Sequence, residues 1–72
     1  MTFNEACRAI VANRGAKALN YAIGYAEYGM SLTSGTHEAK VQTLYIMGNI
    51  THWRGDLAKE VRAAIKKEAG VA

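Results

Sequence analysis

The chain of 72 residues has no proline and a single cysteine, Cys7. One cysteine cannot form an internal disulfide, which fits a protein kept in a reducing compartment. Residues that are hydrophobic make up 50% of the chain and include many alanines, as is typical of a packed helical domain rather than a disordered segment. We therefore expect one all-α domain spanning residues 1–72.

Long apolar runs are also missing. No stretch approaches the roughly 20 apolar residues that a membrane-spanning helix needs. The N-terminal segment MTFNEACRAI carries Glu5 and Arg8 where a secretory leader would be apolar. These two features predict a cytoplasmic protein without a membrane partner.

Charge of either sign is modest. Nine Lys and Arg against six Asp and Glu give a formal net charge of +3. This excess is compatible with contact to nucleic acid or to an acidic protein, although clear nucleic-acid binders cluster their charge more strongly. It disfavours a mimic of DNA, which would be strongly acidic.

The sequence shows no group of residues with the spacing of a catalytic, metal-binding or phosphate-binding site. Cys7 lies in an apolar helical stripe, where a thiol behaves as a small hydrophobe. His37 and His52 have no second His or Cys at helical spacing, and the glycines never form a phosphate-binding loop. We expect no metal, no cofactor and no enzymatic activity.

The first half of the chain predicts two helices, over residues 2–14 and 16–28. Thr2 and Glu5 have the spacing of a capping box, in which each side chain bonds the backbone N–H of the other residue. An apolar stripe at helical spacing follows, and Gly15 and Gly29 are natural helix ends. Gly24 interrupts the second helix, which we interpret as a close approach of a neighbouring helix.

The second half predicts helices over residues 36–53 and 56–68. The first of these is apolar on nearly every side, so we place it at the centre, with a weak point at Gly48 and Asn49. Gly55 should end it and Asp56 should cap the last helix, whose predicted apolar stripe is Leu57, Val61, Ala64 and Ile65. The predicted fold is a compact bundle of four short helices with the third helix central.

Two groups of residues are candidates for binding a partner protein. Tyr21, Tyr25 and Tyr28 form a stripe on one side of the second predicted helix, and tyrosine is enriched at interfaces. His52, Trp53 and Arg54 end the third, and Trp and Arg are frequent binding hot spots. The alternative for both groups is packing in the core, for the tyrosines with hydroxyls reaching solvent.

Nucleic acid is a second candidate partner. The corner at Gly55 resembles a helix-turn-helix, two helices joined by a short turn. The basic residues that could contact phosphates are Arg8, Arg14, Lys17, Arg62, Lys66 and Lys67. However, Leu57 and Ala58 stand at the start of the would-be recognition helix, where side chains able to read bases are expected.

The segments ALNYAIGYAEYGM and KVQTLYIMGNITHWRGDLAKEV resemble short helical accessory proteins of tailed bacteriophages, over about residues 17–66. The resemblance consists of helix faces and one corner and assigns no functional residue. It implies a protein made in the bacterial cytoplasm that binds and inhibits a host protein or defence complex, as anti-CRISPR proteins do. The alternatives are a small DNA-binding regulator and a self-associating structural subunit, such as a homodimer paired through the tyrosine stripe.

Overall fold

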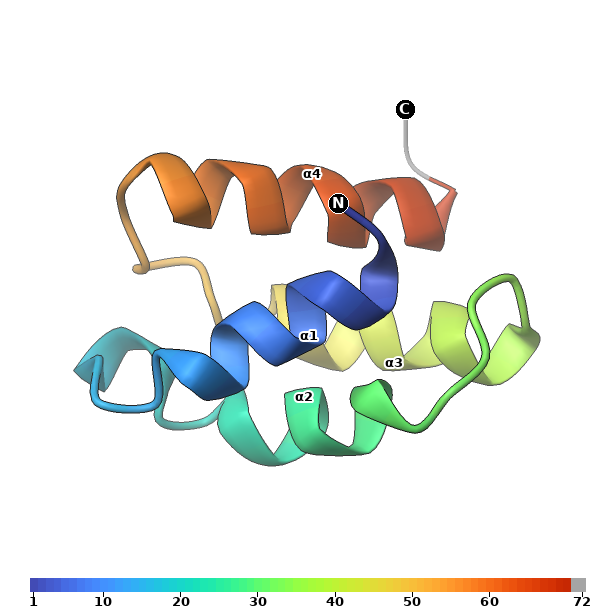
Figure 1. Cartoon of the computed structure of the whole chain (residues 1–72), viewed down its shortest axis with the longest axis horizontal. Helices are drawn as coiled ribbons and strands as arrows, with labels where there is room; N and C mark the ends of the chain where they lie inside the picture. Colours follow the sequence, from blue (N-terminus) through green and yellow to red (C-terminus); the bar gives the residue numbers. More distant parts are fainter. Residues whose placement is uncertain (71–72) are drawn as a thin grey trace.

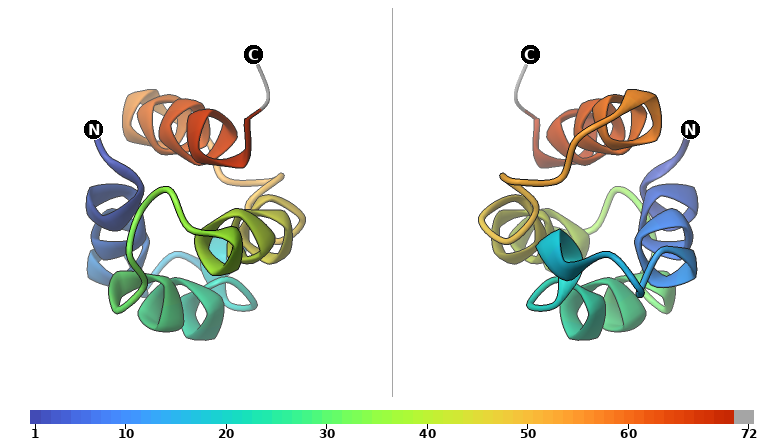
Figure 2. Two further views of the ribbon diagram at one scale, coloured as in Figure 1. Left: turned by 90° about the vertical axis from the view of Figure 1, so that its right-hand side faces the viewer. Right: turned by 90° about the vertical axis from the view of Figure 1, so that its left-hand side faces the viewer.

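Four α-helices form the architecture of residues 1–70, the part of the chain that the computed structural model describes. They are α1 (Phe3–Ala12), α2 (Ile23–Met30), α3 (His37–Met47) and α4 (Asp56–Ala69), with a short 3-10 helix, η1 (Lys17–Leu19), between α1 and α2. No strand occurs within residues 1–70, so the predicted all-α bundle of four helices is confirmed. Figures 1 and 2 show α4, α1, α2 and α3 arranged around one interior.

The start of α1 follows its sequence signal. The Thr2 hydroxyl accepts a hydrogen bond from the Glu5 N–H at 3.1 Å, and the Glu5 carboxylate accepts one from the Thr2 N–H at 2.7 Å. The predicted capping box is therefore confirmed. The helix ends at Ala12, earlier than expected, where Asn13 takes a non-helical conformation and its side chain donates to the Ala9 carbonyl.

The connection to α2 differs from the prediction of a helix over residues 16–28. Residues 16–22 are bonded in the tighter 3-10 pattern, from the Leu19 N–H to the Ala16 carbonyl and from the Ala22 N–H to the Leu19 carbonyl. In a 3-10 turn, residues three apart lie on the same side. Leu19 and Ala22 can therefore both be fully buried, and α2 begins only at Ile23.

The close helix approach lies at Gly29 and not at Gly24, which corrects the expectation for both glycines. A Cβ atom built on Gly24 meets nothing within 4 Å, whereas one on Gly29 would lie 2.6 Å from the Cys7 Sγ and 3.2 Å from the Phe3 Cζ. Gly29 is the next-to-last residue of α2, one residue before the helix ends. The missing side chain allows α1 and α2 to touch.

The central position expected for the third helix is not confirmed. In the ring of helices, α3 packs on α4 and α2, just as α1 packs on α2 and α4, and the most extensive contacts are α1 with α2 and α3 with α4. The buried residues of α3 are Ala39, Gln42, Thr43 and Ile46, while Leu44 and Tyr45 are exposed. The apolar residues on several sides of α3 therefore include an exposed apolar face. They do not indicate a helix that other helices surround.

α3 also ends at Met47, six residues before the predicted end at residue 53. The Asn49 side chain donates to the Tyr45 carbonyl at 2.7 Å. This bond occupies a backbone acceptor that the next turn of the helix would use. The predicted weak point at Gly48 and Asn49 thus ends the helix.

Gly55 has a different role from the one expected. It is the N-cap of α4 with φ +113°, a conformation that L side chains rarely adopt, and Asp56 is the first helical residue. The buried stripe of α4 is Ala58, Val61, Ala64, Ile65 and Ala69. Leu57, which the sequence predicts in this stripe, is 38% exposed.

Across residues 1–70, none of the helices has the length and apolar character needed to cross a membrane.

Candidate docking surface

Exposed tyrosines gather where α2 meets α3. Tyr21, Tyr25 and Tyr28 are 81%, 40% and 56% exposed, and Tyr45 of α3 is 51% exposed. The rings of Tyr25 and Tyr45 are stacked, with centroids 5.3 Å apart and an interplanar angle of 16°. The stripe seen in the sequence is therefore at the surface, and a fourth tyrosine from another helix joins it.

A hydrogen bond joins α2 and α3 at one of the stacked residues. The side-chain amide nitrogen of buried Gln42 in α3 donates to the Tyr25 carbonyl at 2.9 Å. Tyr21 lies in the turn just before α2, outside the helix, and Tyr28 lies one helical turn after Tyr25.

Leu44, next to Tyr45 in the sequence, is also exposed, at 62%, but at 100° per helical residue it points away from Gln42 and α2. We call the set Tyr21, Tyr25, Tyr28 and Tyr45 the tyrosine face. It contains no acidic or basic residue. Scattered exposed apolar residues are ordinary, but a contiguous group of large ones marks an interaction surface.

Sequence reasoning missed Tyr45 and Leu44 as surface residues. Both belong to the helix that the sequence, apolar on nearly every side there, predicts at the centre of the bundle. The available signal was the position of Tyr45 and Leu44 opposite Ala39, Thr43 and Ile46 on one helical wheel. The stack with Tyr25 depends on how α2 and α3 pack and has no local signal.

His52, Trp53 and Arg54 do not form one site. Trp53 is 8% exposed and belongs to the core, as the alternative of core packing predicts. Its assignment to a partner-binding surface is therefore wrong. His52 and Arg54 are exposed, and Arg54 donates to the Thr51 carbonyl at 2.9 Å. A large aromatic residue in a short loop is buried because its apolar area favours the interior.

Arg62 holds the segment around Trp53 in place. Its guanidinium donates to the Trp53 carbonyl at 2.7 Å and to the Ile50 carbonyl at 3.3 Å, and the residue is half-buried. These bonds satisfy carbonyls beyond the end of α3. Arg62 therefore has a structural role, in which its Nη1 is occupied by two backbone carbonyls.

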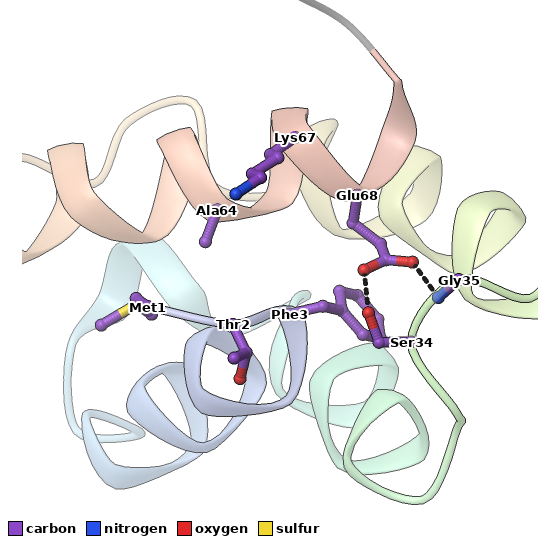
Figure 3. Close-up of a pocket in the computed structure, with 8 residues that line it drawn as sticks. All are labelled: Met1, Thr2, Phe3, Ser34, Gly35, Ala64, Lys67 and Glu68. Carbon is purple, nitrogen blue, oxygen red and sulfur yellow. Dashed lines mark hydrogen bonds between the residues drawn. The ribbon is translucent and has the colours of Figure 1, made fainter.

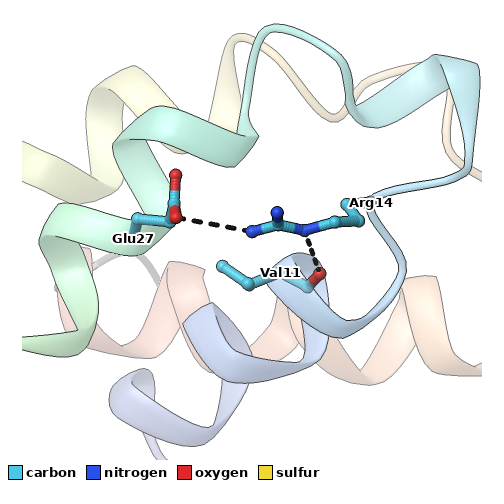
Figure 4. Close-up of polar contacts among 3 residues, drawn as sticks. All are labelled: Val11, Arg14 and Glu27. Atoms are coloured by element: carbon cyan, nitrogen blue, oxygen red, sulfur yellow. Dashed lines mark hydrogen bonds and ion pairs between the residues drawn. The ribbon is translucent and has the colours of Figure 1, made fainter.

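The remaining basic candidates are exposed but are not all free. Arg14 forms an ion pair with Glu27 of α2 at 3.4 Å, and its Nε donates to the Val11 carbonyl at 3.3 Å (Figure 4). Both partners of the pair are more than half exposed, so it contributes little stability. Arg8, Lys17, Lys66 and Lys67 are exposed on three separate segments: α1, η1 and α4.

A cleft of about 360 Å³ lies between the start of α1, the loop before α3 and the end of α4 (Figure 3). Glu68 at its edge accepts hydrogen bonds from the Ser34 hydroxyl and, at 2.6 Å, from the Gly35 N–H. Ser34 thus donates to a carboxylate, and no histidine lines the cleft. The bonds tie the loop to α4.

Cys7 is a free cysteine buried in the core. Burial, and then the charge of Glu68, raises the pKa of the Cys7 thiol to about 11, so the nucleophilic thiolate is scarce at neutral pH. Within residues 1–70, no group of three or more His, Cys, Asp or Glu side chains is placed to hold a metal ion.

Comparisons of the chain with protein-family models, with curated proteins and with solved structures found no match.

Proposed function

We propose that this protein is a small, non-enzymatic binding module that docks on another protein through its tyrosine face. The observation that carries this proposal is the stacked pair Tyr25 and Tyr45, with two further exposed tyrosines, Tyr21 and Tyr28, in and just before α2. Tyrosine contributes much contact area for only two rotatable bonds, so ordering it on binding costs little entropy. The stack also restricts two of the rings before any partner arrives.

The biological setting that we propose is that of a bacteriophage accessory protein in the bacterial cytoplasm. The partner would be a host protein or defence complex, which docking would inhibit in the manner of an anti-CRISPR protein. This setting comes from the resemblance of the sequence, and the tyrosine face supports the docking step alone.

The DNA-binding alternative has less support. Arg62 is engaged by two backbone carbonyls and Arg14 by Glu27, so two of the six candidate cations already have partners. The residues at the start of α4, exposed Leu57 and buried Ala58, cannot read the hydrogen-bonding edges of bases.

The test is co-purification from the bacterial host with a matched pair of variants. Tyr28→Glu adds a charge within the tyrosine face, and Leu57→Glu adds the same charge at another exposed large side chain, on α4. We expect the tagged wild type and Leu57→Glu to retain one host protein in stoichiometric amount and Tyr28→Glu to lose it. Retention of nothing by the wild type, or equal retention by both variants, would contradict the proposal.

A further inference from the structure

The loop between α2 and α3 is held to the rest of the protein differently from the other two connections. The segment before α2 buries Leu19 and Ala22, and the loop before α4 buries Ile50 and Trp53. Residues 33–35, by contrast, are all exposed. A segment without buried side chains opens at low cost in free energy unless polar bonds hold it.

One carboxylate supplies such bonds. The Ser34 hydroxyl and the Gly35 N–H donate to the two oxygens of Glu68 in α4, the latter at 2.6 Å (Figure 3). Within residues 1–70, the other hydrogen bonds of residues 33–35 reach only Thr36, at the start of α3. Hydrogen bonds to a charged acceptor are roughly twice as strong as neutral ones. Glu68 therefore holds this stretch on α4.

Both ends of the stretch are fixed independently of that carboxylate. Asn4 of α1 donates to the Leu32 carbonyl at 2.8 Å. The Thr36 hydroxyl accepts from the Ala39 N–H at 3.2 Å as the cap of α3. Residues 33–35 can therefore leave α4 while the residues on either side stay in place. We call residues 33–35 the strap.

The strap closes one end of the cleft of about 360 Å³, where Ser34 and Gly35 lie beside Glu68 (Figure 3). Phe3 lines the same cleft from α1 and is 2% exposed. Cys7 follows one helical turn later and is fully buried. Movement of the strap would widen the cleft beside these two buried side chains.

We propose that Glu68 latches the strap shut and that the strap swings away from α4 as a local motion while the four helices stay folded. The open form gives a small apolar group access to Phe3 through the cleft. The cleft contains no residue of the tyrosine face, and the motion belongs to the isolated chain, so it does not depend on the proposed docking.

Reaction of Cys7 with a thiol reagent in the native full chain tests the motion, because a buried thiol reacts only when the structure around it opens. Glu68→Gln removes the charge that holds the strap and should speed the labelling at least about tenfold. Glu60→Gln is the matched control, since it removes the same charge from an exposed position of α4 and should label like the wild type.

Ser34→Ala separates the strap from the charge of Glu68. Burial first, and the charge of Glu68 second, raise the pKa of the Cys7 thiol, so Glu68→Gln also increases the thiolate fraction directly. Ser34→Ala keeps that charge and removes one of the two bonds to the strap. We expect it to label Cys7 several-fold faster than the wild type does, an increase smaller than that of Glu68→Gln.

Low concentrations of urea distinguish the local motion from unfolding of the whole chain. Global unfolding exposes much surface and depends steeply on urea, whereas a local opening exposes little and hardly depends on it. We expect labelling of Glu68→Gln and Ser34→Ala to be nearly independent of urea. A steep dependence in the wild type and in both variants would overturn the proposal, as would rates in both variants equal to that of Glu60→Gln.

Discussion

Replacement of Gly29 by alanine tests the contact between α1 and α2 most sharply. The new Cβ would lie 2.6 Å from the Cys7 Sγ, closer than such atoms come in real proteins, and 3.2 Å from the Phe3 Cζ. Both of these side chains are buried, so they have little room to move. Inserting an atom into a packed core costs about 1 to 3 kcal/mol.

Gly24→Ala is the matched control within the same helix. Both changes gain the helical propensity of alanine, about 1 kcal/mol, but the Cβ at residue 24 meets nothing within 4 Å. Propensity therefore cancels in the comparison, and the difference between the two variants reports the overpacking alone. We expect Gly24→Ala to be more stable than the wild type and Gly29→Ala to be about 1 to 3 kcal/mol less stable than Gly24→Ala.

Thermal unfolding followed by circular dichroism measures this difference, at one protein concentration because self-association would itself add stability. For a domain of this size, 1 kcal/mol corresponds to a shift of about 4 to 8 °C in Tm. Adding Cys7→Ala to Gly29→Ala removes the Sγ and should recover part of the loss. Equal stabilisation by Gly24→Ala and Gly29→Ala would refute the packing of α1 on α2 described above.

Three further predictions concern single side chains. Arg62→Ala leaves the carbonyls of Ile50 and Trp53 without their donor and should lower the free energy of unfolding by about 1 to 3 kcal/mol in urea titration; an unchanged value would show that Arg62 does not hold this loop. Glu5 has a pKa held below its ordinary 4.5 first by the Thr2 backbone N–H and then by the Thr2 hydroxyl, so its folded form is stabilised above that pH and loses the benefit as pH falls through the lowered value. The stability difference between wild type and Glu5→Gln should accordingly shrink on acidification, and a difference that grew would have the wrong sign. Cys7, with its pKa raised to about 11, should react with a thiol reagent at pH 8 far more slowly in the folded protein than in urea, whereas equal rates would show that it is accessible.

Local signals in the sequence were sufficient for α1 and for the fold class. The capping box of Thr2 and Glu5 uses only neighbouring residues, and the stripe Phe3, Ala6, Cys7 and Ile10 is buried as its spacing predicts. Such features depend on bonds and faces within one helix. They do not depend on where the other helices lie.

The features that sequence reasoning missed are set by packing between segments. Gly24 and Gly29 look alike in the sequence, and only the position of Cys7 distinguishes them. The burial of Trp53 could not be predicted from the sequence, because it depends on the conformation of the loop after Met47. In that loop Arg62 donates to the Trp53 carbonyl, and the Trp53 side chain is buried in the core. In the tyrosine face, three members were predicted from helical spacing, whereas Tyr45 joins through a contact with another helix.

In the proposed docking, the tyrosines and not the basic side chains contact the partner protein. This claim is tested most directly by titrating the purified host partner with Tyr45→Ala and with Lys66→Ala. We expect Tyr45→Ala to weaken binding at least about tenfold, a loss of about 1.4 kcal/mol or more, while Lys66→Ala and added salt have little effect. Loss of affinity in Lys66→Ala and with salt, but none in Tyr45→Ala, would contradict the claim and favour an electrostatic interface.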